Sequence, residues 1–202
     1  MTDENAPGER APDGRSTGER PSDDPLAWEL LDSEVAYSCP GFDVRRERVR
    51  LPDGTETDFD YLAEPESVVV LPFTPDGDVV VIEEWRQPVR RVNRSLPVGG
   101  TEPDDGDLAA AARRELREET GHEADGVELL TSVEPANGVA NSVLHFFVAR
   151  GCTPTAEQQL DADESIRVDT TTFEALRDHV ASREIRDART TLGVLYYEAF
   201  GD

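Results

Sequence analysis

Residues 100–122 read GTEPDDGDLAAAARRELREETGH, and this stretch decides how the rest of the chain is interpreted. The run that begins at Leu108 is rich in Ala, Leu and Arg, which have high helix propensity. Asp107 stands where an N-cap side chain is expected, and Gly121 stands where helices commonly end in a left-handed residue. The stretch therefore predicts a helix that begins at about residue 108 and ends just before Gly121.

Three carboxylates gather on the second half of this predicted helix. At 3.6 residues per turn, Glu115 and Glu119 lie one above the other and Glu118 lies close to both. Beside them runs an apolar stripe of Leu108, Ala112 and Leu116. Like charges at this spacing weaken a bare helix, so a compensating divalent cation is expected, and carboxylate oxygens suit Mg²⁺ or Mn²⁺. The alternative is a solvated acidic face, since the chain has 44 Asp and Glu residues.

The stretch resembles the Nudix box, whose pattern is Gly, five residues, Glu, seven residues, Arg-Glu-aliphatic, any, Glu-Glu, any, Gly, aliphatic. The matching positions are Gly100, Arg114, Glu115, Leu116, Glu118, Glu119 and Gly121. Two positions depart from the pattern: Gly106 stands in place of the first Glu, and His122 in place of the final aliphatic residue. In the family that first Glu mainly supports the loop and the helix, and Asp105 and Asp107 are the candidates to replace it here.

The resemblance implies a role for each acid. The metal, Mg²⁺ with Mn²⁺ as the alternative, would be held by Glu115, Glu119 and Glu118, and a backbone carbonyl near Gly99 or Gly100 would complete its coordination. Glu118 or Glu164 would orient or deprotonate the attacking water. For Glu164, which lies in an acidic segment before a predicted strand, a solvated loop is the alternative. The structural residues of the box would be Gly100, Arg114, Leu116 and Gly121.

A second segment resembles the substrate-binding part of the ADP-ribose pyrophosphatase-like subgroup. It consists of WRQP from residue 85, followed by LPVG from residue 96. Arg86 would clamp a phosphate, and Trp85 would stack on a base or cover a pocket. Gly100 would let the backbone approach the ligand, and Gly138 would lie in a ligand loop. The alternatives are a core position for Trp85, pairing of Arg86 with local glutamates, and a plain turn at Gly138.

The chain before residue 65 divides into two parts. Residues 1–25 contain Pro, Gly, Ser and charges without an apolar cluster, which predicts a disordered tail. Residues 26–64 have strand character around a turn at 52–54, which predicts a small antiparallel sheet. In the subgroup such a sheet precedes the Nudix domain, here residues 65–202, and helps to build a dimer. We therefore expect a homodimer, with a sheet packed on its own chain as the alternative.

The net charge of −24 limits the partners of this chain. All 20 basic residues are Arg, and such an acidic surface repels nucleic acids and anionic membranes. The acids are spread along the chain, a composition similar to that of proteins from salt-loving organisms. Cys39 and Cys152 have no metal-type spacing and fit a reducing cytoplasm. Since no apolar run could span a membrane or serve as a signal peptide, we expect a cytoplasmic protein.

The alternation of strands with separated helices favours an α/β sandwich, with a mixed sheet between helices and a small antiparallel sheet before it. By resemblance, the function would be metal-dependent hydrolysis of the pyrophosphate of a nucleoside diphosphate linked to another group. ADP-ribose, giving AMP and ribose 5-phosphate, is the substrate most suggested. The alternatives are other nucleoside diphosphate sugars or dinucleotides, and a Nudix-fold sensor that binds a nucleotide without cleaving it.

Overall fold

The computed structural model describes residues 24–161 and 164–201. The described chain forms two compact units: the residues up to Pro65 together with Glu134–Ser142, and Glu66–Val133 together with the residues from Val143. The predicted disordered tail, residues 1–25, lies almost wholly outside the described residues. The domain boundary expected between residues 64 and 65 stays a prediction. That expectation did not include the grouping of segment 134–142 with the N-terminal strands.

The first unit is built on a three-stranded antiparallel sheet in the order β1-β2-β3. Its strands are β1 (Glu29–Cys39), β2 (Phe42–Arg50) and β3 (Glu56–Ala63). The turn between β2 and β3 contains Gly54, whose φ of 85° is a left-handed conformation that favours glycine. Segment 134–142 joins this unit through backbone hydrogen bonds, in which the Leu62 N–H donates to the Val139 carbonyl and the Asn141 N–H donates to the Leu62 carbonyl.

The second unit contains a seven-stranded mixed sheet whose main order is β12-β5-β4-β10-β9. Strands β4 and β10 pair in parallel, and the other pairs are antiparallel. β6 pairs with β5, and β7 pairs with β4. The strands are β4 (Ser67–Phe73), β5 (Asp78–Arg86), β6 (Arg91–Ser95), β7 (Val98–Gly100), β9 (Gly126–Val133), β10 (Leu144–Arg150) and β12 (Ile166–Thr172), and a separate small sheet pairs β8 (His122–Glu123) with β11 (Thr153–Pro154).

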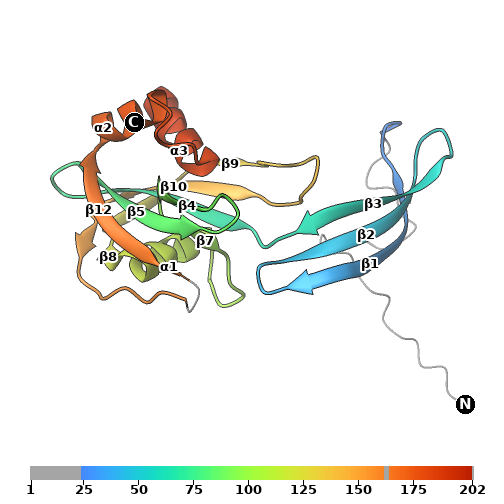
Figure 1. Cartoon of the computed structure of the whole chain (residues 1–202), viewed down its shortest axis with the longest axis horizontal. Coiled ribbons are helices and arrows are strands. Elements are labelled where there is room, and N and C mark those ends of the chain that lie inside the picture. The colour runs from blue at the N-terminus through green and yellow to red at the C-terminus, as the bar shows by residue number, and fades with distance from the viewer. Residues whose placement is uncertain (1–23, 162–163, 202) are drawn as a thin grey trace, which may run out of the picture. The chain divides into compact units, whose positions relative to one another are not determined.

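Helices cover both faces of this sheet (Figure 1). On one face, α1 (Leu108–Thr120) packs its apolar stripe on one core cluster, formed by Val68, Val70, Val80, Ala111, Ala112, Leu116, Phe147, Ala149 and Cys152. On the other face, α2 (Phe173–Ala181) and α3 (Ala188–Phe200) close a second cluster that includes Val69, Val81, Phe146, Leu176 and Val194. This is the α/β sandwich with a mixed sheet that the sequence predicts.

The central strands β4 and β5 are buried on both faces, as their continuous apolar runs predict. The chain leaves β6 through Leu96, whose N–H donates to the hydroxyl of the buried Thr190 on α3 at 3.0 Å. That bond fixes the segment that leads into β7. β7 then runs along β4 with Val68 opposite Gly99 and Ser67 opposite Gly100, so the two glycines come to lie at the side of α1.

Candidate active site around helix α1

Helix α1 begins and ends as the sequence predicts. Asp107 is the N-cap, and its carboxylate accepts the N–H of Ala110 at 2.7 Å. Gly121 follows the helix with a φ of 70°, and its N–H donates to the Arg117 carbonyl. A side chain at Gly121 is doubly disfavoured, because an added Cβ would lie 2.5 Å from the carbonyl oxygen of Ala156. The C-terminal end of α1 therefore lies directly against the loop that follows β11.

This loop makes one wall of a cavity of about 310 Å³ beside α1. It is held to the helix by hydrogen bonds: the Gln159 N–H donates to the Glu118 carbonyl at 2.9 Å, and the Gln158 side chain donates to the Glu119 carbonyl at 2.6 Å. The cavity is lined by Gly99, Gly100, Thr101, Glu102, Arg114, Glu115, Glu118, Glu119, Gln159, Asp161 and Glu164. The carboxylates of α1 and those of the loop thus face one space.

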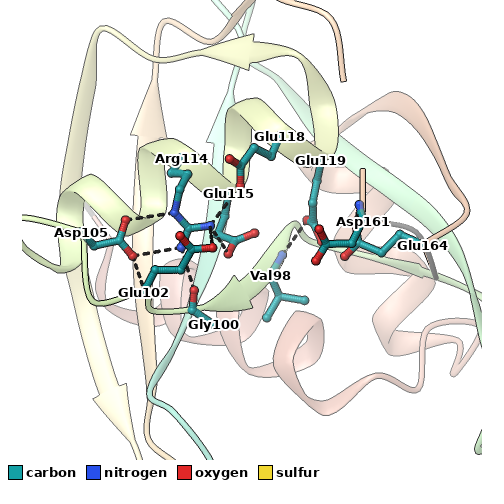
Figure 2. Close-up of polar contacts among 10 residues, drawn as sticks. All are labelled: Val98, Gly100, Glu102, Asp105, Arg114, Glu115, Glu118, Glu119, Asp161 and Glu164. Carbon is teal, nitrogen blue, oxygen red and sulfur yellow. Dashed lines mark hydrogen bonds and ion pairs between the residues drawn. The ribbon is translucent and has the colours of Figure 1, made fainter. Parts of the chain in front are cut away.

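Glu119 is the most deeply placed of these acids, with only 2% of its surface exposed. Its carboxylate accepts the N–H of Val98 at 2.9 Å, which ties α1 to β7 (Figure 2). Burial raises the pKa of Glu119 to about 8; the Val98 hydrogen bond opposes this shift, and the negative charges of Glu115, Glu164 and Glu84 add to it. A carboxylate in this position favours any positive charge that enters the cavity.

Glu115 lies one turn earlier, directly over Gly99. A Cβ added at Gly99 would fall 2.0 Å from the carboxyl carbon of Glu115, so glycine leaves the space that the Glu115 carboxylate occupies. Burial raises the pKa of Glu115 to about 7; the neighbouring Arg114 opposes this shift, whereas the charges of Glu118 and Glu164 add to it. Glu119 is buried and Glu115 is nearly so, and both acids therefore resist losing their protons in the absence of a cation.

Arg114 holds the loop before α1 and also explains how the chain tolerates Gly106. Asp105, the residue next to Gly106, accepts two hydrogen bonds from Arg114, at 3.0 and 2.9 Å (Figure 2). The same guanidinium donates to the Gly100 carbonyl at 2.8 Å, to Glu115 at 2.7 Å and to Glu118 at 3.0 Å. Of the two acids that the sequence offers as replacements for the first box Glu, Asp105 braces the loop and Asp107 serves as the helix N-cap.

Glu118 and Glu164 line the cavity from different elements, Glu118 from α1 and Glu164 from the segment before β12. The Glu118 side chain is about one-third exposed and contacts Arg114. Glu164 accepts the N–H of Asp161 at 3.0 Å and lies on the same side of the site as Glu119 (Figure 2). Because its negative charge raises the pKa of both Glu115 and Glu119, Glu164 is electrostatically part of the same cluster.

Gly100 is the predicted substrate-binding residue that lines the cavity, whereas Arg86, Trp85 and Gly138 do not. Arg86, at the end of β5, makes an ion pair with Glu84 at 2.7 Å, which is the alternative that the sequence left open. Trp85 is 48% exposed and donates its indole N–H to Gln87, so the alternative of a core position is wrong. Gly138 belongs to the segment 134–142 of the first unit, next to residues that line a separate cavity of about 340 Å³ there, among them Phe59 and Tyr61.

Sequence reasoning did not single out several residues that shape the site. Gln158 and Gln159 fix the loop that carries Glu164, and neither has a sequence signature. Glu84 is buried on β5, and the only signal in the sequence is an acid that directly follows the apolar run of this strand. These positions depend on contacts between elements far apart in the chain.

The donor set of the cavity fits a divalent cation. Carboxylates and backbone carbonyls are hard oxygen donors of the kind that Mg²⁺ and Mn²⁺ select, and two of the carboxylates have pKa values raised by desolvation. Within residues 24–161 and 164–201, no three Asp, Glu, His or Cys side chains already converge on one point closely enough to form a ready-made ion site. The hydrogen bonds from Arg114 to Glu115 and Glu118 supply part of the balancing positive charge.

None of the helices in the described part of the chain is long and apolar enough to cross a membrane. The sequence led us to expect no membrane span for the same reason, since it has no apolar run of the required length.

Comparison with known proteins agrees with this geometry. The family model described as the NUDIX domain matches residues 63–190. An ADP-ribose pyrophosphatase of Bacillus subtilis (strain 168) is 31% identical over 178 residues, which cover 86% of this chain and 94% of the relative. A methanol dehydrogenase activator of Bacillus methanolicus is 29% identical over 169 residues, covering 83% and 91% of the two chains.

In shape, the chain is similar to a solved structure described as an ADP compounds hydrolase. The TM-score is 0.75 at 19% identity, with 86% of this chain and 93% of the other covered. This likeness shows the fold alone, whereas the family match spans more than half of the chain and includes the whole of α1 and its glycine-rich entry. The chain therefore belongs to the Nudix family of hydrolases.

Proposed function

We propose that this hydrolase cleaves the pyrophosphate of ADP-ribose with water, yielding AMP and ribose 5-phosphate, and that Mg²⁺ is its cofactor, with Mn²⁺ as a working substitute. The observation that carries the proposal is that Glu115 and Glu119, two acids largely withdrawn from solvent, line the same cavity as Glu164 beside a glycine-rich strand. The 31% identity to an ADP-ribose pyrophosphatase over most of both chains supports the choice of substrate.

The residues that would hold the cation are Glu115, Glu119, Glu118 and the carbonyl of Gly99. A divalent ion bound there would neutralise charge on the pyrophosphate oxygens and lower the pKa of the attacking water. Gly99 leaves room for Glu115, and the hydrogen bond from Val98 keeps Glu119 directed into the cavity. Both contacts fix the carboxylates before any ligand arrives.

Glu164 or Glu118 would take the proton of the attacking water as its oxygen bonds to phosphorus and the bridging P–O bond breaks. Glu164 is positioned from the loop and Glu118 from the helix, so the two acids could act from different sides of the water. Arg86 would bind phosphate through the donors that Glu84 leaves unused, and Trp85 offers an exposed aromatic face. Gly100 would allow close approach of the ligand, and Gly138 would belong to a loop that contacts it.

We also propose a homodimer formed through the sheet of the first unit. Trp28, Val35, Tyr37 and Phe59 are exposed on or beside this sheet, and a three-stranded sheet with so much apolar surface is an association site. Light scattering in molar KCl would give a dimer mass for the full chain and a monomer mass for Val35→Asp. A monomeric wild-type chain would refute the dimer. The free thiols of Cys39 and Cys152 are consistent with a cytoplasmic location.

The substrate proposal is tested with the full chain, Mg²⁺ and a panel of ADP-ribose, other nucleoside diphosphate sugars and dinucleotides. Products are identified by chromatography, so that AMP with ribose 5-phosphate is distinguished from other cleavage patterns. We expect the highest kcat/KM for ADP-ribose and full loss of activity in excess chelator. A preference for another member of the panel would reassign the substrate, and binding without turnover of any member would indicate a sensor.

The role of the helix acids is tested by Glu119→Gln, which removes the charge and nearly keeps the shape. We expect turnover to fall at least about a hundredfold, because charge stabilisation by a bound metal contributes several kcal/mol to the transition state. Circular dichroism of the variant should match the wild type. Normal turnover in a folded Glu119→Gln protein would refute the proposed mechanism.

A further inference from the structure

Strand β5 carries a buried charge at a position where its neighbours are apolar. Val80 packs in the core cluster under α1, and the regular pairing of β5 with β12 and β6 places Ile82 and Glu84 on the same face. Glu84 is only 6% exposed, and it lies between strands on both sides, with Ile166 and Asn93 as its cross-strand partners. A carboxylate at such a position is unfavourable unless it is paired.

The partner of Glu84 is Arg86, two residues later on the same face of β5. The Arg86 guanidinium lies 2.7 Å from the Glu84 carboxylate through one terminal nitrogen, Nη2. A guanidinium has five N–H donors, so this single ion-pair contact restrains the Arg86 side chain beside Glu84 and still leaves donors for a second anion. The Arg86 side chain is 30% exposed and can therefore be reached from solvent, although Glu84 cannot.

Glu84 lies opposite Ile166 of β12, two residues after Glu164, which lines the cavity beside α1. The ion pair thus lies on the strand next to the segment that carries Glu164, one of the acids that line the cavity. An unpaired Arg86 would be attracted to these acids, and its pairing with Glu84 restrains it. This gives the buried carboxylate a task that an apolar residue of similar size could not perform.

We propose that Glu84 is a positioning residue that holds Arg86 in the orientation needed to receive a substrate phosphate. The inference rests on the proposed function, since it takes Arg86 as the phosphate contact. It adds that the affinity for the anionic substrate depends on a side chain that does not itself touch the substrate. Loss of Glu84 should therefore weaken substrate binding much more than it slows the chemical step.

The test compares Glu84→Gln with Glu83→Gln in the full chain with Mg²⁺. Glu83 is the matched control: it is the preceding residue of β5, lies on the opposite face and pairs with Arg94 and Arg167. We expect Glu84→Gln to raise KM for ADP-ribose about tenfold with less than a threefold change in kcat, and Glu83→Gln to change neither by more than twofold. A purely structural ion pair would lower the melting temperature of Glu84→Gln and leave KM unchanged.

A double-mutant cycle with Arg86→Ala separates action through Arg86 from a direct effect on the site. In the Arg86→Ala background, Glu84→Gln should change KM by less than twofold, because the side chain that it positions is gone. If Glu84→Gln and Arg86→Ala raised KM by independent factors that multiply in the double variant, the proposal would be overturned. If the wild-type chain does not cleave ADP-ribose, the proposed function fails, and the same cycle is then measured as the affinity for ADP by calorimetry, with the same two outcomes deciding the role of Glu84.

Discussion

Replacing Glu119 by Gln should stabilise the metal-free protein at pH 8, although the same change should abolish activity. The carboxyl of Glu119 has a pKa of about 8 in the folded chain against a reference value of 4.5. Because the folded-state pKa is raised, the folded state holds its proton where the unfolded state has lost it. The contribution of Glu119 to the free energy of unfolding therefore becomes steadily less favourable as pH rises from 4.5 towards 8.

The size of the effect follows from this shift. At about 1.4 kcal/mol per pKa unit, Glu119 destabilises the folded state by about 4 kcal/mol at pH 8 and by about 1 kcal/mol at pH 5.5. Gln cannot ionise and can still accept the Val98 hydrogen bond, but its NH₂ group needs a partner, at a cost of about 1–3 kcal/mol. The net gain at pH 8 is then about 2 kcal/mol, which corresponds to about 5 °C in melting temperature.

The assay is thermal unfolding in EDTA at constant KCl, followed by circular dichroism at pH 5.5 and pH 8. Glu128→Gln on β9 is the control, because it changes the net charge equally at an exposed position and should shift the melting temperature by less than about 2 °C. With Mg²⁺ in place of EDTA the wild type should melt at a higher temperature than Glu119→Gln, since only the wild type gains stability from binding the ion. A Glu119→Gln protein that melts below the wild type at pH 8 in EDTA, or that keeps the same difference at pH 5.5, would refute the reasoning.

Four further changes test separate parts of the structure. Asp105→Ala removes the bidentate partner of Arg114 and should lower kcat about tenfold in a steady-state assay. Asp107→Ala removes only the helix cap, so it should lower the free energy of unfolding by about 1 kcal/mol in urea and leave kcat normal. Arg183 has a φ of 66°, a conformation that favours glycine, so Arg183→Gly should raise the free energy of unfolding in urea by about 1 kcal/mol. Molar KCl should raise the melting temperature by screening the net charge of −24, and a flat salt curve would contradict a salt adaptation.

The sequence predicted helix α1 closely because its signals are local. The N-cap Asp107, the run of helix formers and the left-handed Gly121 all lie within fifteen residues of one another, and each acts on the backbone next to it. The spacing of Glu115 and Glu119 fixes their common face in the same way. The central strands β4 and β5 were also foreseen, since they are apolar runs on either side of a turn with Pro and Gly.

Contacts between distant segments were not foreseen. Nothing in the local sequence indicates that the Val98 N–H donates to Glu119, that Leu96 is held by Thr190 or that the segment 134–142 groups with the N-terminal strands. Short strands such as β7 carry too few residues for a periodic signal. The sequence offers Asp105 and Asp107 as candidates to replace the missing box Glu. Only the directions of their side chains show that Asp105 braces the loop through Arg114 and that Asp107 caps the helix.

Burial is what distinguishes the acids of the site from the other acids of this chain. Asp60 and Glu56 lie on the N-terminal sheet, pair with exposed arginines and have lowered pKa values, so they remain ionised and solvated over a wide pH range. Glu115 and Glu119 have raised pKa values because the protein removes them from water without a full countercharge. A chain that places acids almost everywhere on its surface cannot select a cation by the number of carboxylates. It can select one by keeping two of them in a place where ionisation is unfavourable until the cation binds.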